Sequence, residues 1–313
     1  MAVARIAEPL PTTNRARMKR RDLADLLLLA AIWGASFLFM RIAAPSFGPV
    51  ALVAARMTIG GLFLLPLLAL RGGLGSLWNH ARPIALIGVV NSAVPFVLIT
   101  YAMLTLTAAF ASVLNATVPM WTALIAAVFL RERVRAAQWF GLAVGAAGVV
   151  VLVGDRIEFD PSGALWRETL AIFAALGGML FYAISAHLAR RILADVPPLA
   201  TATGSQLTAA LLLAPAALAT WPAQPPTLTQ WGAAIVLGVL CTAVGYLLYF
   251  RLIGNVGAMR ASNVTYLIPL FATLWGTVFL AEPLTLRLAV GGAIVLAGTA
   301  LALGAVPRLP RHR

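Results

Sequence analysis

Long apolar runs make up most of the chain, and short polar segments separate each run from the next. An α-helix needs about 20 apolar residues to cross the hydrocarbon core of a bilayer, and each run is close to that length. The pattern therefore predicts an all-α integral membrane protein without a soluble domain. Its ten membrane-spanning helices are expected at residues 23–42, 49–70, 83–103, 107–130, 136–154, 168–189, 199–220, 231–253, 257–280 and 285–304.

One long segment of the chain occurs twice. Residues 88–148 align without a gap with residues 238–298, and 18 of the 61 aligned pairs are identical. Each half holds five spans, an odd number, so the second copy must enter the membrane from the side opposite to the first. The sequence thus predicts two inverted five-helix repeats, an arrangement that allows a carrier to expose one central site to each side in turn.

Composition and charge agree with a membrane location. The chain is 61% hydrophobic and 11% charged, against about 25% charged residues in soluble domains. Of its 23 basic residues, 18 fall in segments on the predicted cytoplasmic side, which the positive-inside rule explains without a nucleic-acid partner. We therefore expect a multi-pass protein of a bacterial-type inner (plasma) membrane with both termini in the cytoplasm. The segment RERVR at 131–135 corresponds to AEPLT at 281–285, which lacks its arginines. This loss of positive charge is consistent with the second copy being inverted, because the second segment then lies outside.

Several motifs after about residue 22 are shared with a known family. They are Trp33-Gly34, Arg56 and the run ASVLNATVPMWTALIAAVFLRE at 111–132, which recurs as ASNVTYLIPLFATLWGTVFLAE at 261–282. With these features the chain resembles the ten-helix branch of the drug/metabolite transporter superfamily, built from two EamA-type halves. The resemblance implies export or exchange of amino acids, other metabolites or small cations. On this interpretation the chain divides into a cytoplasmic tail at 1–22, a first repeat at 23–154, an outer loop at 155–167, a second repeat at 168–304 and a cytoplasmic tail at 305–313.

The fourth and ninth spans each carry a polar face that ends in a proline. The first face holds Ser112, Asn115 and Pro119, and the second holds Ser262, Thr265 and Pro269. Polar groups avoid lipid, so each face is predicted to look into the bundle, either as a cavity wall or as hydrogen-bonding contacts between helices. Proline frees a backbone carbonyl and softens a helix, which makes Pro95, Pro119 and Pro269 the predicted hinge or gating residues.

Polar and aromatic side chains in other spans are placed where a cavity halfway through the membrane could gather them. Aromatic walls with few hydrogen-bonding groups suit a small organic solute. For any single Trp or Tyr, packing in the core or at the membrane interface is the competing interpretation. The predicted solute-binding residues are Trp33, Ser36, Arg56, Asn91, Asn115, Tyr182, Gln206, Tyr246, Asn263 and Tyr266.

Arg56 is the charge that carries most information. An arginine inside a span costs about 3 kcal/mol or more on insertion scales, so it faces a partner, a water-filled cavity or the membrane interface. No Asp or Glu lies deep inside any predicted span. Our hypothesis is that Arg56 binds a substrate carboxylate or backbone carbonyls near a vestibule. Snorkelling to the interface and structural hydrogen bonding are the alternatives, and Arg41 is a second candidate for the same role.

Catalytic, metal and cofactor sites are not predicted. The HExxH, GxSxG and P-loop motifs are absent, and Cys241 is the only cysteine, which fits a buried structural thiol. We therefore expect a protein that is not an enzyme and uses no cofactor. His187 is the only histidine within a predicted span. Transport driven by the solute gradient is expected, with proton coupling through His187 as the alternative.

Taken together, these patterns predict a secondary transporter that exports or exchanges a small organic metabolite by alternating access around a midplane cavity. Amino acids or similar solutes are the first choice. The alternatives are a multidrug or small-cation exporter and a membrane scaffold without transport. The expected partners are a small-molecule substrate and membrane lipid, for a monomer or weak homodimer. Contact between helices or protomers is predicted at Gly141, Gly145 and Gly148 and at Gly291, Gly292 and Gly298.

Overall fold

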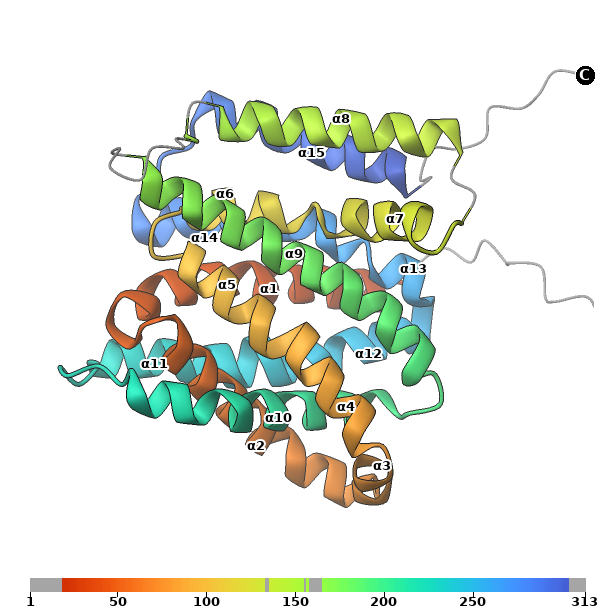
Figure 1. The fold of residues 1–313 in the computed structure, drawn as a ribbon, viewed down its shortest axis with the longest axis vertical. Coiled ribbons are helices and arrows are strands. Elements are labelled where there is room, and N and C mark those ends of the chain that lie inside the picture. The colour runs from red at the N-terminus through yellow and green to blue at the C-terminus, as the bar shows by residue number, and fades with distance from the viewer. Residues whose placement is uncertain (1–18, 133–134, 155, 158–164, 304–313) are drawn as a thin grey trace, which may run out of the picture.

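The regular elements of the protein are helices throughout the residues that the computed structural model describes, namely 19–132, 135–154, 156–157 and 165–303 (Figure 1). Two further apolar helices, Val264–Leu280 and Leu286–Ala302, have 17 residues each and are shorter than the stretches that are long enough to cross a membrane. The prediction of an all-α membrane protein is confirmed, while the count of ten spans stays a prediction. Within the described ranges, eight helical stretches are long and apolar enough to cross a membrane: Arg20–Phe47, Pro49–Leu70, Ala81–Ala102, Ala108–Val128, Ala136–Val153, Trp166–Ile192, Pro198–Ala219 and Leu228–Val256.

Some of these stretches are single helices and others are divided. The undivided ones are α1 (Arg20–Phe47), α2 (Pro49–Leu70), α8 (Ala136–Val153), α9 (Trp166–Ile192), α10 (Pro198–Ala219) and α15 (Leu286–Ala302). In the third and eighth stretches a π-helix interrupts the α-helix, giving α4 (Ala81–Ile87), η1 (Gly88–Ala93) and α5 (Val94–Ala102), and then α11 (Leu228–Val236), η2 (Leu237–Val244) and α12 (Gly245–Val256). The short helix α3 (Leu74–Asn79) joins α2 to α4.

The predicted spans at 107–130 and 257–280 are not continuous helices, which corrects the expectation of an unbroken polar face in each. A turn at 116–117 separates α6 (Ala108–Asn115) from α7 (Val118–Val128), and a turn at 262–263 separates α13 (Ala258–Ala261) from α14 (Val264–Leu280). Pro119 is the second residue of α7, where its missing N–H costs no helical hydrogen bond. Pro269 lies within α14.

The two copies of the repeated sequence fold into corresponding elements. Adding 150 to the bounds of η1 gives a segment inside η2, and α8 corresponds in the same way to α15. In Figure 1, α7 runs toward the right-hand end of the bundle and α8 begins there, whereas α14 runs toward the left-hand end and α15 begins there. We call the left-hand end, where α6 and α15 begin, the α6 end. The right-hand end, where α13 and α8 begin, is the α13 end.

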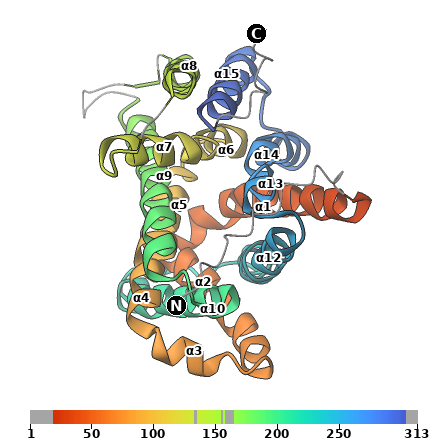
Figure 2. The ribbon, with the colours of Figure 1, turned by 90° about the vertical axis from the view of Figure 1, so that its right-hand side faces the viewer.

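Helices α8 and α15 form an outer layer, side by side in both Figure 1 and Figure 2. Glycines from both helices line their contact. A Cβ on Gly148 would meet the backbone of Val295, one on Gly291 would lie 3.0 Å from the backbone of Leu152, and one on Gly298 would lie 2.8 Å from the carbonyl oxygen of Gly141. The predicted glycine contact is therefore present, and it joins two helices of the same chain.

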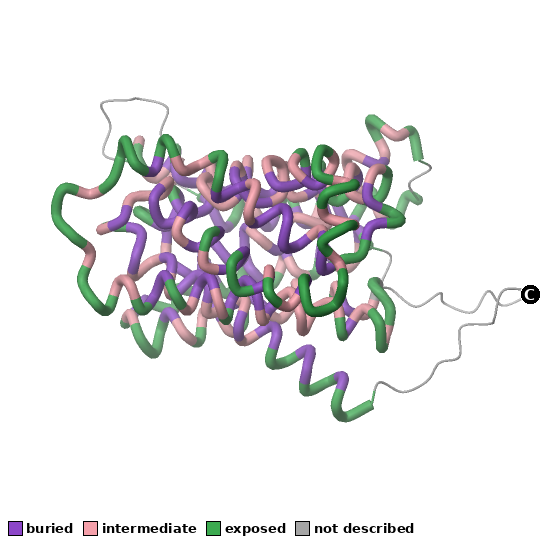
Figure 3. Tube along the Cα trace, turned by 90° about the horizontal axis from the view of Figure 1, so that it is seen from below, coloured by how far each residue is buried: buried purple, intermediate pink, exposed green. Residues whose placement is uncertain are grey.

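Buried residues lie in the interior, and large apolar side chains are exposed on the outer surface, as in a protein surrounded by lipid. Buried segments gather in the middle of the bundle and exposed ones on its rim (Figure 3). Many exposed side chains are large and apolar, among them Leu211, Leu218 and Leu286, each more than 70% exposed. Such surface leucines are compatible with hydrocarbon, where only the backbone and polar groups need internal partners.

Replacement of Gly298 by alanine is expected to destabilise the protein. Its Cβ would overlap backbone atoms of Gly145, which cannot move away as a flexible side chain would, at a cost of about 2 kcal/mol. Gly232→Ala is the matched control, because a Cβ there meets nothing within 4 Å and alanine favours a helix over glycine. Apparent melting temperatures in detergent measure both. Equal melting temperatures for the two variants would contradict the close α8–α15 contact.

Candidate functional site

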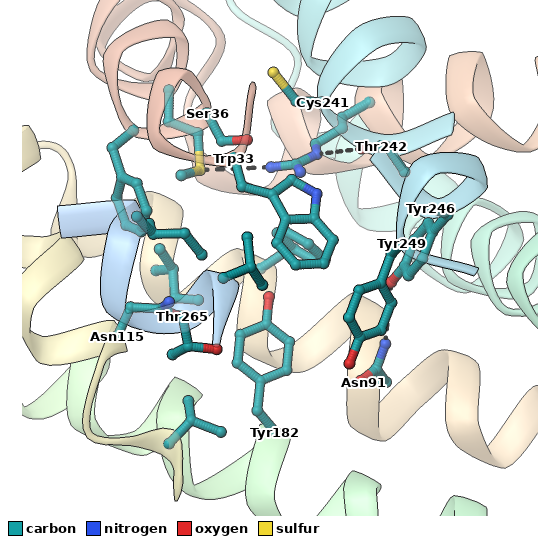
Figure 4. A pocket seen from close by; sticks show the side chains of 18 residues that line it. Trp33, Ser36, Asn91, Asn115, Tyr182, Cys241, Thr242, Tyr246, Tyr249 and Thr265 are labelled. Carbon is teal, nitrogen blue, oxygen red and sulfur yellow. Dashed lines mark hydrogen bonds between the residues drawn. The ribbon is translucent and has the colours of Figure 1, made fainter. Parts of the chain in front are cut away.

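A cavity of about 330 Å³ lies inside the bundle between α1, α2, the η1–α5 segment, α6, α7, α9, the η2–α12 segment and α14. Its size is at the lower end of the range for small-molecule sites. Both copies of the repeat contribute to the wall. Figure 4 shows the side chains of Trp33, Tyr182, Tyr249 and Asn91 turned toward one another around this space.

Arg56 supplies the positive charge of the cavity wall. Its side chain comes from α2 and is 4% exposed. Nε donates to the hydroxyl of Thr242 at 2.9 Å, one Nη lies 3.7 Å from the sulfur of Met40, and the guanidinium lies 4.1 Å from the centre of the Phe96 ring. A guanidinium has five N–H donors, and a thioether is a weak acceptor. Within the described residues, no carboxylate lines the cavity beside it.

Aromatic rings make up much of the remaining wall, together with the amides of Asn91 and Asn115. The rings of Trp33 and Tyr249 are 5.2 Å apart, and those of Phe96 and Tyr182 meet edge to face at 5.9 Å. Asn91 is held from both ends of its amide: it donates to the hydroxyl of Tyr246 at 3.4 Å and accepts from the hydroxyl of Ser185 at 3.2 Å. The wall is thus mostly apolar, with a few oriented polar groups.

The π-helices place part of this wall. Asn91 lies in η1, and Cys241 and Thr242 lie in η2, at corresponding places in the two copies. The Thr242 hydroxyl donates to the carbonyl of Leu237, five residues earlier, and so can accept from Arg56 in a fixed direction. A π-helix widens one turn, and such turns are frequent at functional sites.

Of the ten predicted solute-binding residues, seven line the cavity: Trp33, Ser36, Arg56, Asn91, Asn115, Tyr182 and Tyr246. The other three do not. Gln206 is buried and donates to the hydroxyl of Ser92, Asn263 is exposed near the α13 end, and Tyr266 is half-buried. The predicted hinge residues Pro95, Pro119 and Pro269 are also outside the lining. Their role in binding or hinging stays a prediction.

Several lining residues were not predicted as solute-binding residues. Some are apolar, namely Met40, Phe96, Ile99, Val118, Val264 and Ile268. A sequence offers no signal that separates such residues from apolar residues that face lipid. The others are Phe37, Cys241, Thr242, Tyr249 and Thr265. Of these, Thr265 lies on the polar face that was predicted to look into the bundle, where it corresponds to Asn115 in the repeat, and Cys241 was expected only as a structural thiol.

The cavity wall along α1 is buried more deeply toward the α6 end. Phe37 and Met40 of α1, and Ile99 of α5 on the same side, are 5%, 3% and 3% exposed. Trp33 of α1 and Tyr249 of α12, which lie toward the α13 end, are half-buried.

Charged groups elsewhere in the described residues are held near helix ends. Asp25 in the second turn of α1 pairs with Arg251, and Arg41 donates to the carbonyl of Met103 at 2.8 Å. Arg41 does not line the cavity, so its candidacy as a solute-binding residue has no support from the geometry. In the part of the chain that the structure describes, no group of three His, Cys, Asp or Glu residues is placed to hold a metal ion.

Comparison with known proteins agrees with this architecture. The chain is 29% identical over 287 residues to the inner membrane transporter YedA of Escherichia coli K12, covering 89% of this chain and 90% of that protein. It is 29% identical over 284 residues to a probable terminal-alkyne amino-acid exporter of Streptantibioticus cattleyicolor, covering 88% and 91%. An uncharacterized transporter of Archaeoglobus fulgidus is 25% identical over 273 residues, covering 87% and 95%.

A solved crystal structure has the same fold, with a TM-score of 0.65 at 24% identity, and covers 92% of this chain and 99% of its own. The sequence model of the EamA-like transporter family matches two segments of the chain, residues 24–154 and 169–304. These segments contain the helices that surround the cavity. The chain therefore belongs to the EamA-like transporter family.

Proposed function

We propose that the protein exports or exchanges a small organic solute that carries a carboxylate, with amino acids as the first candidates. The carrying observation is the Arg56 guanidinium in the wall of an otherwise uncharged, aromatic-lined cavity. A carboxylate can accept bidentate, charge-assisted hydrogen bonds from such a group, and a low-dielectric site strengthens them. The name of the Streptantibioticus relative, an amino-acid exporter, supports the same class of solute.

The alternative of a hydrophobic-cation exporter has less support. A buried cation is stabilised by a carboxylate or by aromatic faces, and the cavity offers aromatic rings together with a fixed positive charge. Arg56 would repel a cationic solute. A scaffold without transport would leave a solute-sized cavity with oriented polar groups without a use.

We propose that the protein works by alternating access: two inverted five-helix repeats move against each other and expose the cavity to each side of the membrane in turn. Support comes from the corresponding elements of the two copies and from the opposite directions of the α7–α8 and α14–α15 pairs (Figure 1). The positive-inside pattern supports a cytoplasmic position for the α13 end and both termini. We propose that the cavity opens toward this side, where its wall along α1 is less buried, and receives there a solute for export.

Replacement of Arg56 by glutamine is expected to reduce counterflow of carboxylate solutes at least about tenfold, because a charge-assisted hydrogen bond is worth roughly twice a neutral one. The measurement uses labelled amino acids and their carboxamide analogues in proteoliposomes. Arg41→Gln is the matched control: it removes an arginine of the α6 end that does not line the cavity. Equal counterflow of a carboxylate and its carboxamide by the unmutated protein would contradict the proposed role of Arg56.

Proton coupling through His187 is disfavoured by its contacts. Arg190 donates to Nδ1 at 2.8 Å, so the ring proton is on Nε2, which donates to the carbonyl of Thr122 at 2.9 Å. The ring is 8% exposed and does not line the cavity. Protonation of Nδ1 would break the contact with Arg190. Transport driven by the solute gradient is therefore the mode we propose.

His187→Gln is expected to leave counterflow within about twofold of the unmutated rate, because glutamine can donate to Thr122 and accept from Arg190 through neutral hydrogen bonds. A pH-sensitive dye inside the same vesicles is expected to report no proton movement when solute is added. Solute-dependent proton flux, whether lost or kept in the variant, would contradict uncoupled transport.

A further inference from the structure

Glu282 ties the second copy of the repeat to the first at the α6 end. Both oxygens of its carboxylate lie 3.0 Å from the backbone nitrogen of Ala108, the first residue of α6, and the side chain is 9% exposed. The hydroxyl of Thr107 accepts from the nitrogen of Phe110, so the two side chains share the free N–H groups of the first turn. An anion is stabilised at such a helix start.

Glu132 occupies the corresponding position in the first copy of the repeat and follows a turn with the same geometry. Glu132 and Glu282 correspond in the repeat, and each donates its backbone N–H to a carbonyl six residues earlier, on Ala126 at 3.0 Å and on Gly276 at 3.1 Å. The residue before each glutamate has positive φ, 54° at Arg131 and 51° at Ala281. No other non-glycine residue in the described ranges has positive φ. Both copies therefore end the preceding helix with a left-handed residue directly before the glutamate.

The contacts of the two glutamates differ. Glu132 is exposed, and its carboxylate has no hydrogen-bond or ion-pair partner in the part of the chain that the structure describes. The residue that corresponds to Ala108 is Ala258, which is also exposed, and its N–H has no acceptor among the described residues.

The segments around the two glutamates also differ in their burial. All residues of α6 from Ala108 to Leu114 are at most 4% exposed. In the corresponding segment, Ala258 and Asn263 are exposed. Leu106, just before α6, is 2% exposed, whereas its counterpart Val256 is half-buried. One end of the bundle is thus closed around its glutamate while the other is open.

We propose that Glu282 and Glu132 are positioning residues that close the cavity at one end at a time. In the present state Glu282 accepts from the Ala108 N–H and holds the α6 end shut. In the opposite state Glu132 accepts from the Ala258 N–H and holds the α13 end shut, while Glu282 is released. The exchange replaces one contact by its repeat-related equivalent, which keeps two states close in free energy. This inference rests on the proposed alternating access.

Thiol labelling in lipid nanodiscs tests the exchange, because both faces of the protein are accessible there and no solute is needed. Cys241→Ala removes the only cysteine. Leu106→Cys then reports opening of the α6 end, and Val256→Cys reports opening of the α13 end. The rate of reaction with a charged maleimide is measured for each reporter in the unmutated background, with Glu282→Gln and with Glu132→Gln.

Glu282→Gln is expected to raise the labelling rate at Leu106→Cys about tenfold and to lower the rate at Val256→Cys, because the charge-assisted bond that favours the present state is weakened. Glu132→Gln is expected to change both rates in the opposite direction, and the double variant to return toward the unmutated rates. The control variants are Glu168→Gln, which removes the ion pair with Arg156, and Asp195→Asn, which removes an exposed acid between α9 and α10. Neither is expected to change the ratio of the two rates.

The proposal is overturned if Glu132→Gln leaves both rates unchanged, or if the two glutamate variants shift the ratio in the same direction. Glu132 is exposed, so its variant tests the idea even if Glu282→Gln does not fold. Counterflow by the same variants in proteoliposomes separates the role of the glutamates from the proposed transport function. If the protein exchanges solute but the glutamate variants do not change the labelling rates, only the role of the glutamates is contradicted. If the two variants shift the labelling rates in opposite directions but no solute is exchanged, only the proposed transport function is contradicted.

Discussion

A bilayer offers no water to the backbone, and this constraint explains where the chain is helical and where its helices are interrupted. Each buried N–H and C=O must find a partner inside the protein, so irregular backbone is tolerated only where protein or a cavity surrounds it. The interruptions obey that limit: η1, η2 and the turns at 116–117 and 262–263 all lie in segments that contribute to the cavity wall. Departures from the α-helix therefore coincide with the place where the molecule needs polar groups.

Helix packing in the same medium depends on close approach. Apolar side chains are as well solvated by lipid as by each other, so a helix pair is held by backbone contact between small residues. Helices α8 and α15 satisfy this requirement with glycines on both sides of one contact and form a separate layer (Figure 2). The remaining helices are left to surround the cavity, whose wall combines one arginine, one hydrogen-bonded asparagine and several aromatic rings.

The sequence predicted the helix positions well because apolar run length is a direct signal of membrane helices, and the bounds of α2 agree with the predicted 49–70. The polar part of the cavity was also largely predictable, because Arg56, Asn91 and Asn115 have few acceptable environments in lipid. Apolar wall residues such as Ile99 and Val264 were not predictable, since the same side chains serve equally at the lipid surface. Gln206 lies outside the cavity lining, where its amide nitrogen donates to the hydroxyl of Ser92.

The matched positions of η1 and η2 also bear on the history of the chain. A π-helix arises when one extra residue enters an α-helix, and two independent insertions at the same register of two copies would be a coincidence. A single insertion into one ancestral copy, followed by duplication and fusion, accounts for both. The widened turn is then older than the two-copy molecule.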